Sequence, residues 1–353
     1  MFAEIEYPKK LLPEELDQYL ARGWFRMRQT IFTTNFLHFK QQFYSAIWLR
    51  VLLDDSIYDK KYFALAKQNK KFRSEIKKSL KGAISSQHQA LYEHYRQSIS
   101  FDVSATLTEL LSGNEIYNRF NTYEVNIYDG DTLIGAGFFD MGEKSAAGIT
   151  SIYHPAYKKY TLGKYLMYLK MDFCKQQEVH FFYPGYVVPG YTPFDYKLEI
   201  GKATLQYLQL ATQKWIPVAS SIENPLQEMT KKLAVLEQNL SQDNIANALL
   251  NYKFFEVNLE PYYHGQQLFD FPVFLFCSPI TEAPFYNIIV YDVRGAKYKL
   301  LQCYSIMNIG VQGVGSDIFD SDLLKVKRVL FSTEIKDEMV YFLVAMMEKR
   351  IIL

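Results

Sequence analysis

The alternation of hydrophobic and polar positions predicts an ordered α+β unit in the middle of the chain. We expect two alternating strands at 121–129 and 132–140, joined by a tight turn, and a third strand at 148–153. A helix that begins at 162 and a fourth strand at 179–183 follow. The turn Asp129-Gly130-Asp131 is typical of a β-hairpin. A loop rich in Gly, Pro and Tyr follows the last strand and ends at Tyr196 and Lys197.

The flanking regions carry further patterns. Before this unit we expect a short helix at 13–22, two strands at 30–39 and 46–53, and a long helical region at 60–112. Beyond Trp215-Ile216-Pro217, we expect a helix at 225–250 and three strands at 273–277, 287–293 and 299–307. An amphipathic helix is expected at 323–350. These patterns predict a mixed α+β or α/β fold with three domains, at 1–112, 113–220 and 221–353, the last of unknown role.

Composition narrows the class of protein. The chain has 353 residues, 49% of them hydrophobic, which is enough for a large core. Three isolated cysteines, Cys174, Cys277 and Cys303, form no C-x-x-C pair. A metal centre held by thiolates needs about four ligands, so we expect no bound metal and no cofactor. Without a signal peptide or an apolar run of membrane-spanning length, a cytoplasmic protein is expected, with no membrane partner.

Charge is distributed unevenly along the chain. Residues 1–100 contain 17 Lys and Arg against 10 Asp and Glu, although the net charge of the whole chain is only +1. Most of this excess lies in residues 60–81, where nine basic side chains accompany the single acidic residue Glu75. Such a segment either attracts a phosphate backbone or is simply a solvated helix surface.

Several short motifs add a family resemblance to these patterns. They are Arg22-Gly23-Trp24-Phe25-Arg26, Ile47-Trp48-Leu49-Arg50-Val51, Leu91-Tyr92-Glu93-His94-Tyr95, Ser151-Ile152-Tyr153, Thr161-Leu162-Gly163-Lys164-Tyr165, Tyr183-x-Gly185-Tyr186 and Tyr196-Lys197. Their order over about residues 12–220 resembles the arginyl-tRNA–protein transferases and their bacterial leucyl-transferring relatives. That family carries a cysteine cluster between the first two motifs. Residues 27–46 contain no cysteine, so the chain resembles a divergent member without the metal cluster.

The resemblance implies an activity and a fold. Members of the family move an aminoacyl group from the 3′ ester of a charged tRNA to the α-amino group of a protein N-terminus, so the implied partners are aminoacyl-tRNA and a protein or peptide N-terminus. The order hairpin, strand, helix, strand is that of a GNAT-like acyltransferase sheet. We therefore expect a mostly antiparallel sheet over 115–215, with the helix from Leu162 on one face and the strand at Phe181 splayed from its neighbour.

Site residues follow from the motifs and from the chemistry. An ester is already activated, so positioning, oxyanion stabilisation and one proton transfer suffice. Catalytic roles are expected for Asp172, Tyr186 and Lys197. Substrate-binding roles are expected for Tyr153, Leu162, Gly163, Tyr165, Tyr183, Gly185 and Tyr196. Contacts to tRNA are expected from Lys70, Lys71, Lys77 and Lys78.

Some of these roles can be stated more closely. A backbone N–H near Leu162 and Gly163, or a tyrosine hydroxyl, could bind the oxyanion, and the loop tyrosines could stack on the terminal adenosine. Asp172 would act as proton acceptor or read a cationic aminoacyl side chain, unless it is a solvated helix carboxylate. Lys197 is expected to be exposed and to share a cleft with Tyr186 and the helix start.

Two alternatives remain open. A GNAT-type enzyme using acyl-CoA would need a glycine-rich pyrophosphate loop, and residues 158–163 offer only part of one. A non-catalytic descendant would bind RNA or a protein partner instead. Serine-hydrolase, P-loop and Rossmann motifs do not occur in the sequence.

Overall fold

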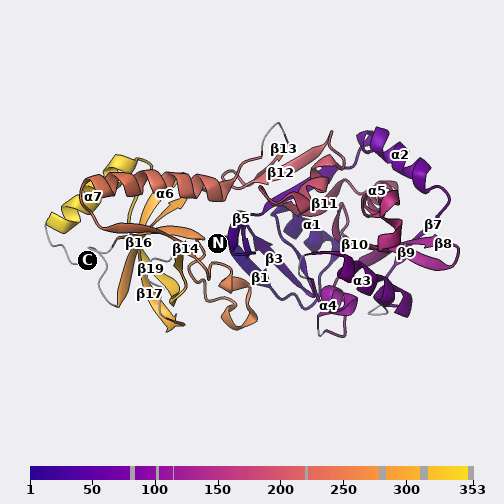
Figure 1. Ribbon diagram of the computed structural model, residues 1–353, viewed down its shortest axis with the longest axis horizontal. Helices are drawn as coiled ribbons and strands as arrows, with labels where there is room; N and C mark the ends of the chain where they lie inside the picture. Colours follow the sequence, from indigo (N-terminus) through magenta and orange to yellow (C-terminus); the bar gives the residue numbers. More distant parts are fainter. Residues whose placement is uncertain are drawn as a thin grey trace.

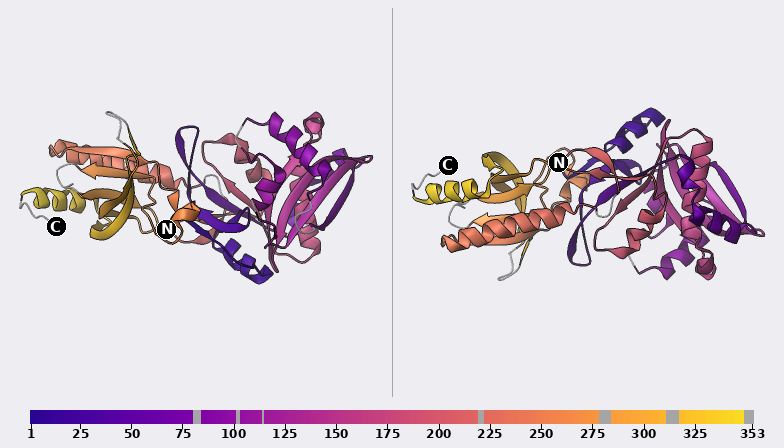
Figure 2. Two further views of the ribbon diagram at one scale, coloured as in Figure 1. Left: turned by 90° about the horizontal axis from the view of Figure 1, so that it is seen from below. Right: turned by 90° about the horizontal axis from the view of Figure 1, so that it is seen from above.

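The computed structural model describes residues 1–79, 84–100, 103–113, 115–218, 222–277, 284–310 and 317–348. The described strands form a sheet of eight, a sheet of six, and smaller sheets of three and two. The molecule is elongated, with the six-stranded sheet and its helices at one end and the eight-stranded sheet toward the other (Figures 1 and 2).

The eight-stranded sheet has the order β13-β12-β6-β11-β10-β9-β8-β7. Its strands in chain order are β6 (Ile47–Leu52), β7 (Arg73–Lys78), β8 (Thr122–Asp129), β9 (Thr132–Met141), β10 (Ser145–Tyr153), β11 (Phe181–Val187), β12 (Leu205–Gln209) and β13 (Lys214–Pro217). Neighbours pair antiparallel except β10 and β11, which pair parallel. The expected hairpin and the mostly antiparallel sheet are confirmed.

Two sequence-based expectations for the N-terminal region are wrong. The predicted boundary at residue 112 cuts through the sheet, because β6 lies in its interior and β7 forms its edge. The region 60–112 is not helical throughout, because β7 interrupts it. Charged side chains are common on edge strands, where they discourage pairing with other chains, and their abundance masks the strand pattern here.

Helices and a small sheet cover the two faces of the eight-stranded sheet. One face carries α2 (Lys60–Asn69) and α5 (Leu162–Gln176). The other carries α1 (Pro13–Ala21), α3 (Ser86–Ser98), α4 (Leu107–Ser112) and the sheet of β1 (Ala3–Glu6), β2 (Phe25–Met27) and β3 (Thr30–Thr34). The alternation of β9 shows the division, because Phe139 packs in the core under α5 and Phe138 in the core under α3 and α4.

The six-stranded sheet belongs to the C-terminal part of the chain, in the order β18-β14-β15-β16-β17-β19. Its elements are α6 (Pro225–Gln242), β14 (Asn247–Tyr252), β15 (Val273–Cys277), β16 (Phe285–Asp292), β17 (Lys297–Asn308), β18 (Ile318–Phe319), β19 (Asp322–Thr333) and α7 (Lys336–Glu348). In Figure 1, α6 and α7 run along one side of this sheet.

Two helices were predicted too long in this part. The helix from Pro225 ends at Gln242, and Asn244 follows with a φ of 56°, a left-handed conformation that stops a helix. The helix predicted over 323–350 is instead β19 followed by α7. Register shifts between β17 and β19 break the strict alternation by which a strand is recognised.

The start of the chain packs against the C-terminal part. Phe2 is fully buried, 5.0 Å from Phe271 between ring centroids, and the Arg294 guanidinium lies 3.9 Å over its ring. A two-stranded hairpin, β4 (Phe36–Phe39) and β5 (Gln42–Ser45), makes a second contact, since Phe36 packs edge-on against Phe255. The strand predicted over 30–39 is thus two strands, β3 and β4, which belong to different sheets.

Candidate functional site

Strands β10 and β11 diverge after a short stretch of pairing. Their paired residues are 145–147 and 181–183. At the point of divergence β10 shifts register against β9 beside Gly148, and β11 shifts against β6 around Pro184. Proline has no N–H to donate to a ladder, and a bulge bends the strand that carries it. The predicted splay of the strand at Phe181 is therefore confirmed.

A buried lysine fixes the bulge in β10. Lys170 reaches from α5 between β9 and β10, where its ammonium donates to the carbonyls of Phe138 at 3.1 Å and Thr150 at 2.7 Å. Its path requires Gly137, because a Cβ there would lie 2.6 Å from the Lys170 Cε. The carbonyl groups around the bulge thus find a donor from the helix rather than from a neighbouring strand.

A cavity of about 220 Å³, called here the splay cavity, lies on the sheet face opposite α5, where the two strands part. It is lined by Phe25, Arg26, Phe32, Trp48, Asp140, Ala147, Gly148, Ile149, Pro184, Gly185, Tyr186, Phe194 and Lys197. Aromatic rings dominate the wall: Trp48 stacks on Phe25 at 3.7 Å and meets Tyr186 edge-on at 4.9 Å. Three charged side chains face this apolar surround.

Lys197 is held inside the protein. Its side chain is only 8% exposed, and its Nζ donates to the Tyr186 carbonyl at 2.7 Å. The same nitrogen lies 4.7 Å over the Phe194 ring. Gly185 has a φ of 92°, and a Cβ there would lie 3.3 Å from the Lys197 Nζ, so glycine suits both the turn and the close approach. Burial lowers the pKa of Lys197 to about 7.

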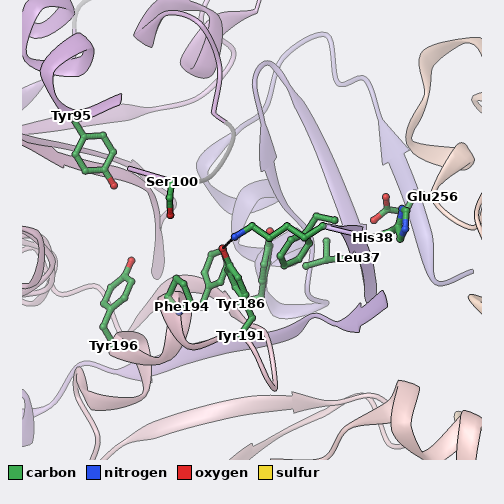
Figure 3. Close-up of a pocket in the computed structure, with 12 residues that line it drawn as sticks. Leu37, His38, Tyr95, Ser100, Tyr186, Tyr191, Phe194, Tyr196 and Glu256 are labelled. Atoms are coloured by element: carbon green, nitrogen blue, oxygen red, sulfur yellow. Dashed lines mark hydrogen bonds between the residues drawn. The ribbon is translucent and has the colours of Figure 1, made fainter. Parts of the chain in front are cut away.

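A second cavity of about 470 Å³, called here the tyrosine cavity, adjoins the first, because Tyr186 and Phe194 line both. Its lining comprises Leu37, His38, Phe39, Lys40, Tyr95, Ser100, Tyr186, Tyr191, Pro193, Phe194, Tyr196 and Glu256 (Figure 3). These residues come from the β4–β5 hairpin, from α3 and the segment just after it, from β11 and the loop that follows it, and from the C-terminal part. Figure 3 shows Tyr95 and Tyr196 at one end and Glu256 beside His38 at the other.

Polar groups are spread along the tyrosine cavity. Lys40 Nζ donates to the Tyr191 hydroxyl at 3.4 Å. Burial raises the pKa of Glu256 to about 7, although the backbone N–H of His38 favours its ionised form. Burial and, to a smaller extent, the charge of Glu256 raise the pKa of Tyr186 to about 12, so its hydroxyl stays protonated. The cavity can therefore offer both donors and acceptors to a ligand that stacks on its rings.

The structure brings together four of the residues predicted from the sequence. Tyr186, Gly185 and Lys197 line the splay cavity, and Tyr186 and Tyr196 line the tyrosine cavity. The expected exposure of Lys197 is wrong, because aromatic side chains and the turn of Gly185 enclose it. Tyr183 lines neither cavity; it is 1% exposed and packs among the core rings between the sheet and α1.

The residues around the start of α5 lie behind the site. Leu162 is fully buried in the core under α5, and Tyr165 packs at its margin. Gly163 faces the ring of Tyr153, where an added Cβ would be 3.5 Å away. Tyr153 in turn packs edge-on against Tyr95, a wall residue of the tyrosine cavity. The helix start therefore supports that wall and lines neither cavity.

Asp172 is separated from the other predicted catalytic residues. It lies on α5, across the sheet from the splay cavity, and its carboxylate accepts a hydrogen bond from the Tyr58 hydroxyl at 2.6 Å. Gln176 donates to its second oxygen at 3.2 Å. This carboxylate is used within the α2–α5 side of the protein, so a role beside Lys197 is not supported.

The four predicted tRNA contacts are exposed at the end of α2 and on β7. Lys71 lies 4.8 Å over the rings of Phe72 and Tyr160, and Lys77 pairs with Glu75 and Glu124 at 3.1 and 3.3 Å. Lys70 and Lys78 complete this surface, whereas Lys81 lies outside the described residues. Strand β7 is four strands from β11, which corresponds to about 19 Å.

Sequence reasoning missed several wall residues. Asp140 gave no local signal, because it lies inside an otherwise apolar strand and only cross-strand pairing places it near the splay. Glu256 and Lys40 come from segments with no motif. Trp48 was part of a recognised motif, but its position in the wall depends on its pairing with Tyr186.

The described residues show neither a metal-ligand cluster nor a membrane-spanning helix. In them, no three His, Cys, Asp or Glu side chains gather as metal ligands would. None of the described helices combines the length and the apolar character needed to cross a membrane. All three cysteines are buried, and burial raises the pKa of Cys277 and of Cys303 to about 12.

Comparison with known proteins shows a family match that covers part of the site. Residues 87–207 match the family model of the C terminus of arginine-tRNA-protein transferases. This stretch includes Tyr95, Asp140, Tyr186 and Lys197, and it ends before the C-terminal sheet begins. Curated relatives are aspartate/glutamate leucyltransferases from two strains of Leptospira interrogans, 22% identical over 216 residues, which cover 60% of this chain and 81% of the relatives.

Solved structures are similar at a lower level. One is L-PGS from Bacillus licheniformis, with 12% identity, a TM-score of 0.34, and coverage of 67% of this chain and 58% of that one. Another is the C-terminal domain of an Agrobacterium fabrum protein described as a lysylphosphatidylglycerol synthetase, with 10% identity, a TM-score of 0.32, and coverage of 40% and 46%. This chain therefore spans less than two thirds of either solved chain.

Replacing the buried amine of Lys197 should stabilise the protein. Below its pKa of about 7 the folded state bears the cost of a buried charge, and between pH 7 and 10.5 folding must release a proton. Lys197→Met keeps most of the volume and removes this cost, less about 1 kcal/mol for the lost hydrogen bond to Tyr186. We expect the free energy of unfolding in urea to rise by roughly 1–3 kcal/mol at pH 6.5 and by less at pH 9.5.

The exposed Lys202 provides the matched control, since Lys202→Met should change stability by less than about 0.5 kcal/mol at both pH values. A Lys197→Met protein that is clearly less stable than the wild type at pH 6.5 would contradict the account of the buried amine.

Proposed function

We propose that this chain, which belongs to the arginyl-tRNA–protein transferase family, moves an arginyl or leucyl group from charged tRNA to the α-amino group of a protein N-terminus. The observation that carries the proposal is the pair of adjoining cavities that share Tyr186 and Phe194, with the buried amine of Lys197 in contact with both shared residues. A transferase with two substrates needs two sites that meet at the reacting atoms.

The tyrosine cavity suits the terminal adenosine of the tRNA. Its volume of about 470 Å³ is in the usual range for small-molecule sites, and the rings of Tyr186, Tyr191 and Tyr196 offer faces for stacking. Ser100, Lys40 and Glu256 could hydrogen-bond the base or ribose. The 3′ ester would then lie near Tyr186, which belongs to both cavities.

Lys197 is the proposed proton acceptor. The amine nitrogen of the acceptor attacks the ester carbonyl carbon, a C–N bond forms, and the C–O bond to the ribose breaks with its electron pair on the 3′ oxygen. The nitrogen gives one proton to the Lys197 Nζ, which returns it to the 3′ oxygen. The nitrogen becomes positively charged when it attacks, and an α-ammonium group has a pKa of roughly 7.7–8.0, close to the pKa of about 7 of Lys197, so the proton transfer is nearly balanced.

Tyr186 is the proposed stabiliser of the oxyanion. Its hydroxyl remains protonated at neutral pH and can donate to the oxygen that gains charge when the nitrogen attacks. Such a donor is most effective where water is excluded, as in the aromatic surround of the two cavities. We also infer a GNAT-like arrangement, since the splayed pair β10 and β11 follows an antiparallel hairpin and flanks helix α5.

The acceptor arm of the tRNA is proposed to follow the basic surface of α2 and β7. Lys61 at the start of α2 pairs with Glu199 at 3.4 Å, and Lys164 at the start of α5 pairs with the same carboxylate at 2.7 Å. These pairs connect the basic surface with the loop that carries Lys197. Positive charge along this path would neutralise phosphates between the duplex and the 3′ end.

The direct test is a transfer assay with purified protein. We expect tRNA charged with labelled arginine or leucine to label peptides that begin with aspartate or glutamate, acceptors suggested by the names of the curated relatives. The kcat/KM for peptide should rise between pH 6 and 8 with an apparent pKa near 7, because the neutral form of Lys197 accepts the proton. Lys197→Met should lower kcat at least 100-fold.

Lys202→Met is the control and should keep wild-type rates. An acyl-CoA donor is included as a further arm: transfer from acyl-CoA but not from charged tRNA would replace this function with that of an acyl-CoA-dependent enzyme. Wild-type transfer by Lys197→Met would remove Lys197 from the mechanism.

The basic surface is tested by charge reversal. The double variant Lys70→Glu, Lys71→Glu should raise the KM for charged tRNA about tenfold, leave the KM for peptide unchanged, and flatten the dependence of the tRNA KM on salt. A matched pair of adjacent exposed lysines on α6, Lys231 and Lys232, is the control. Equal effects of the two double variants would show that the charge effect is not local.

A further inference from the structure

Asp140, which lines the splay cavity, has one buried carboxylate oxygen that no donor among the described residues reaches. Asp140 is fully buried, and its Oδ1 accepts from the Arg26 guanidinium at 2.9 Å and from the Thr122 hydroxyl at 2.6 Å. Among the described residues, its Oδ2 has no hydrogen-bond donor. A buried carboxylate oxygen without a donor costs free energy, so such an atom commonly marks a place where a ligand or a water binds.

The pairing of the strands places Asp140 on the sheet face that carries the cavity. Asp140 on β9 pairs with Ala147 on β10, and Ala147 pairs with Tyr183 on β11. Directly paired residues point to the same face, so this row crosses three strands beside the gap. Ala147 and Asp140 both line the cavity, whereas Tyr183, the third residue of the row, is buried in the neighbouring core.

The Arg26 guanidinium already has hydrogen-bond acceptors within the protein. Besides Asp140 and Thr122, its guanidinium donates to the backbone carbonyls of Arg28, at 2.6 Å, and of Leu111. Its side chain is 4% exposed. Burial raises the pKa of Asp140, and the charge of Arg26 opposes that rise. Arg26 also fixes the side chain through Oδ1 and leaves Oδ2 as a possible acceptor in a cavity whose aromatic rings also attract cations.

Building on the proposed function, we propose that the splay cavity binds the N-terminal α-amino group of the acceptor peptide, with Asp140 Oδ2 accepting a hydrogen bond from that amine. Asp140 is thus a binding residue for the acceptor, and Lys197 takes the proton that the amine gives up. The rings of Trp48, Phe25 and Phe32 surround the place proposed for the amine.

The aminoacyl group also has an α-amino group, and the cavity has to be assigned to one of the two. The attacking amine must touch the group that accepts its proton, and Lys197 lines the splay cavity but not the tyrosine cavity. The aminoacyl ester arrives from the side of the tyrosine cavity, where the adenosine is proposed to bind. The amine in the splay cavity is therefore that of the acceptor.

The test measures binding without tRNA, so it is independent of the transfer assay. The full-length wild-type chain is titrated by calorimetry with an acceptor peptide and with the same peptide acetylated at its N-terminus. We expect the free amine to bind at least tenfold more tightly. Equal affinities would overturn the proposal. Amine-selective binding by a chain that transfers nothing would leave this site in place and contradict the proposed function instead.

Variants locate the effect on Asp140. Asp140→Asn places an amide where the free oxygen lies and should abolish the tenfold preference for the free amine. Thr122→Val removes a donor to Oδ1 and an acceptor for Arg26 and Asn118, but it leaves Oδ2 unchanged, so it should retain the preference. If Asp140→Asn weakens binding of charged tRNA but not of peptide, then Asp140 Oδ2 binds the aminoacyl group and the proposal is wrong. Should that variant not fold, the two peptides on the wild-type chain decide.

Discussion

Strands β10 and β11 run parallel but pair only over 145–147 and 181–183, and the candidate site depends on this short pairing. Each strand has a register shift where they part, and Pro184 has no N–H to donate there. At the bulge in β10, the Lys170 ammonium donates to the Thr150 carbonyl. The cavities lie beside this opening and share Tyr186 of β11. A regular parallel pair would place side chains where the splay cavity now lies.

The site also contains polar groups whose burial costs stability. Lys197, Asp140 and Glu256 are each largely withdrawn from solvent, and burial shifts the pKa of each toward its neutral form. Large apolar cores on both faces of the sheet and under α6 and α7 offset that cost. Lys197 and Glu256, each with a pKa of about 7, can exchange a proton with a substrate at neutral pH more readily than groups with ordinary pKa values can.

Local patterns in the sequence were sufficient for part of this account. The hairpin, the splayed strand, α5 and the proximity of Tyr186 to Lys197 follow from turn residues, periodicity and motif order. The strand β7 was masked by its charges. Asp172 was misplaced because spacing along a helix does not reveal which sheet face the helix covers. Asp140 and Glu256 depend on cross-strand register and on the packing of the C-terminal part, which no short segment encodes.

The most direct measurement of the central claim is a crystal structure with a stable analogue of the aminoacyl-tRNA end, an adenosine that carries leucine or arginine through a 3′ amide. The account predicts adenine stacked on the rings of the tyrosine cavity, with the amide carbonyl between Tyr186 and Lys197 at the opening of the splay cavity. Density for the analogue on the α5 side of the sheet, near Asp172, would contradict it.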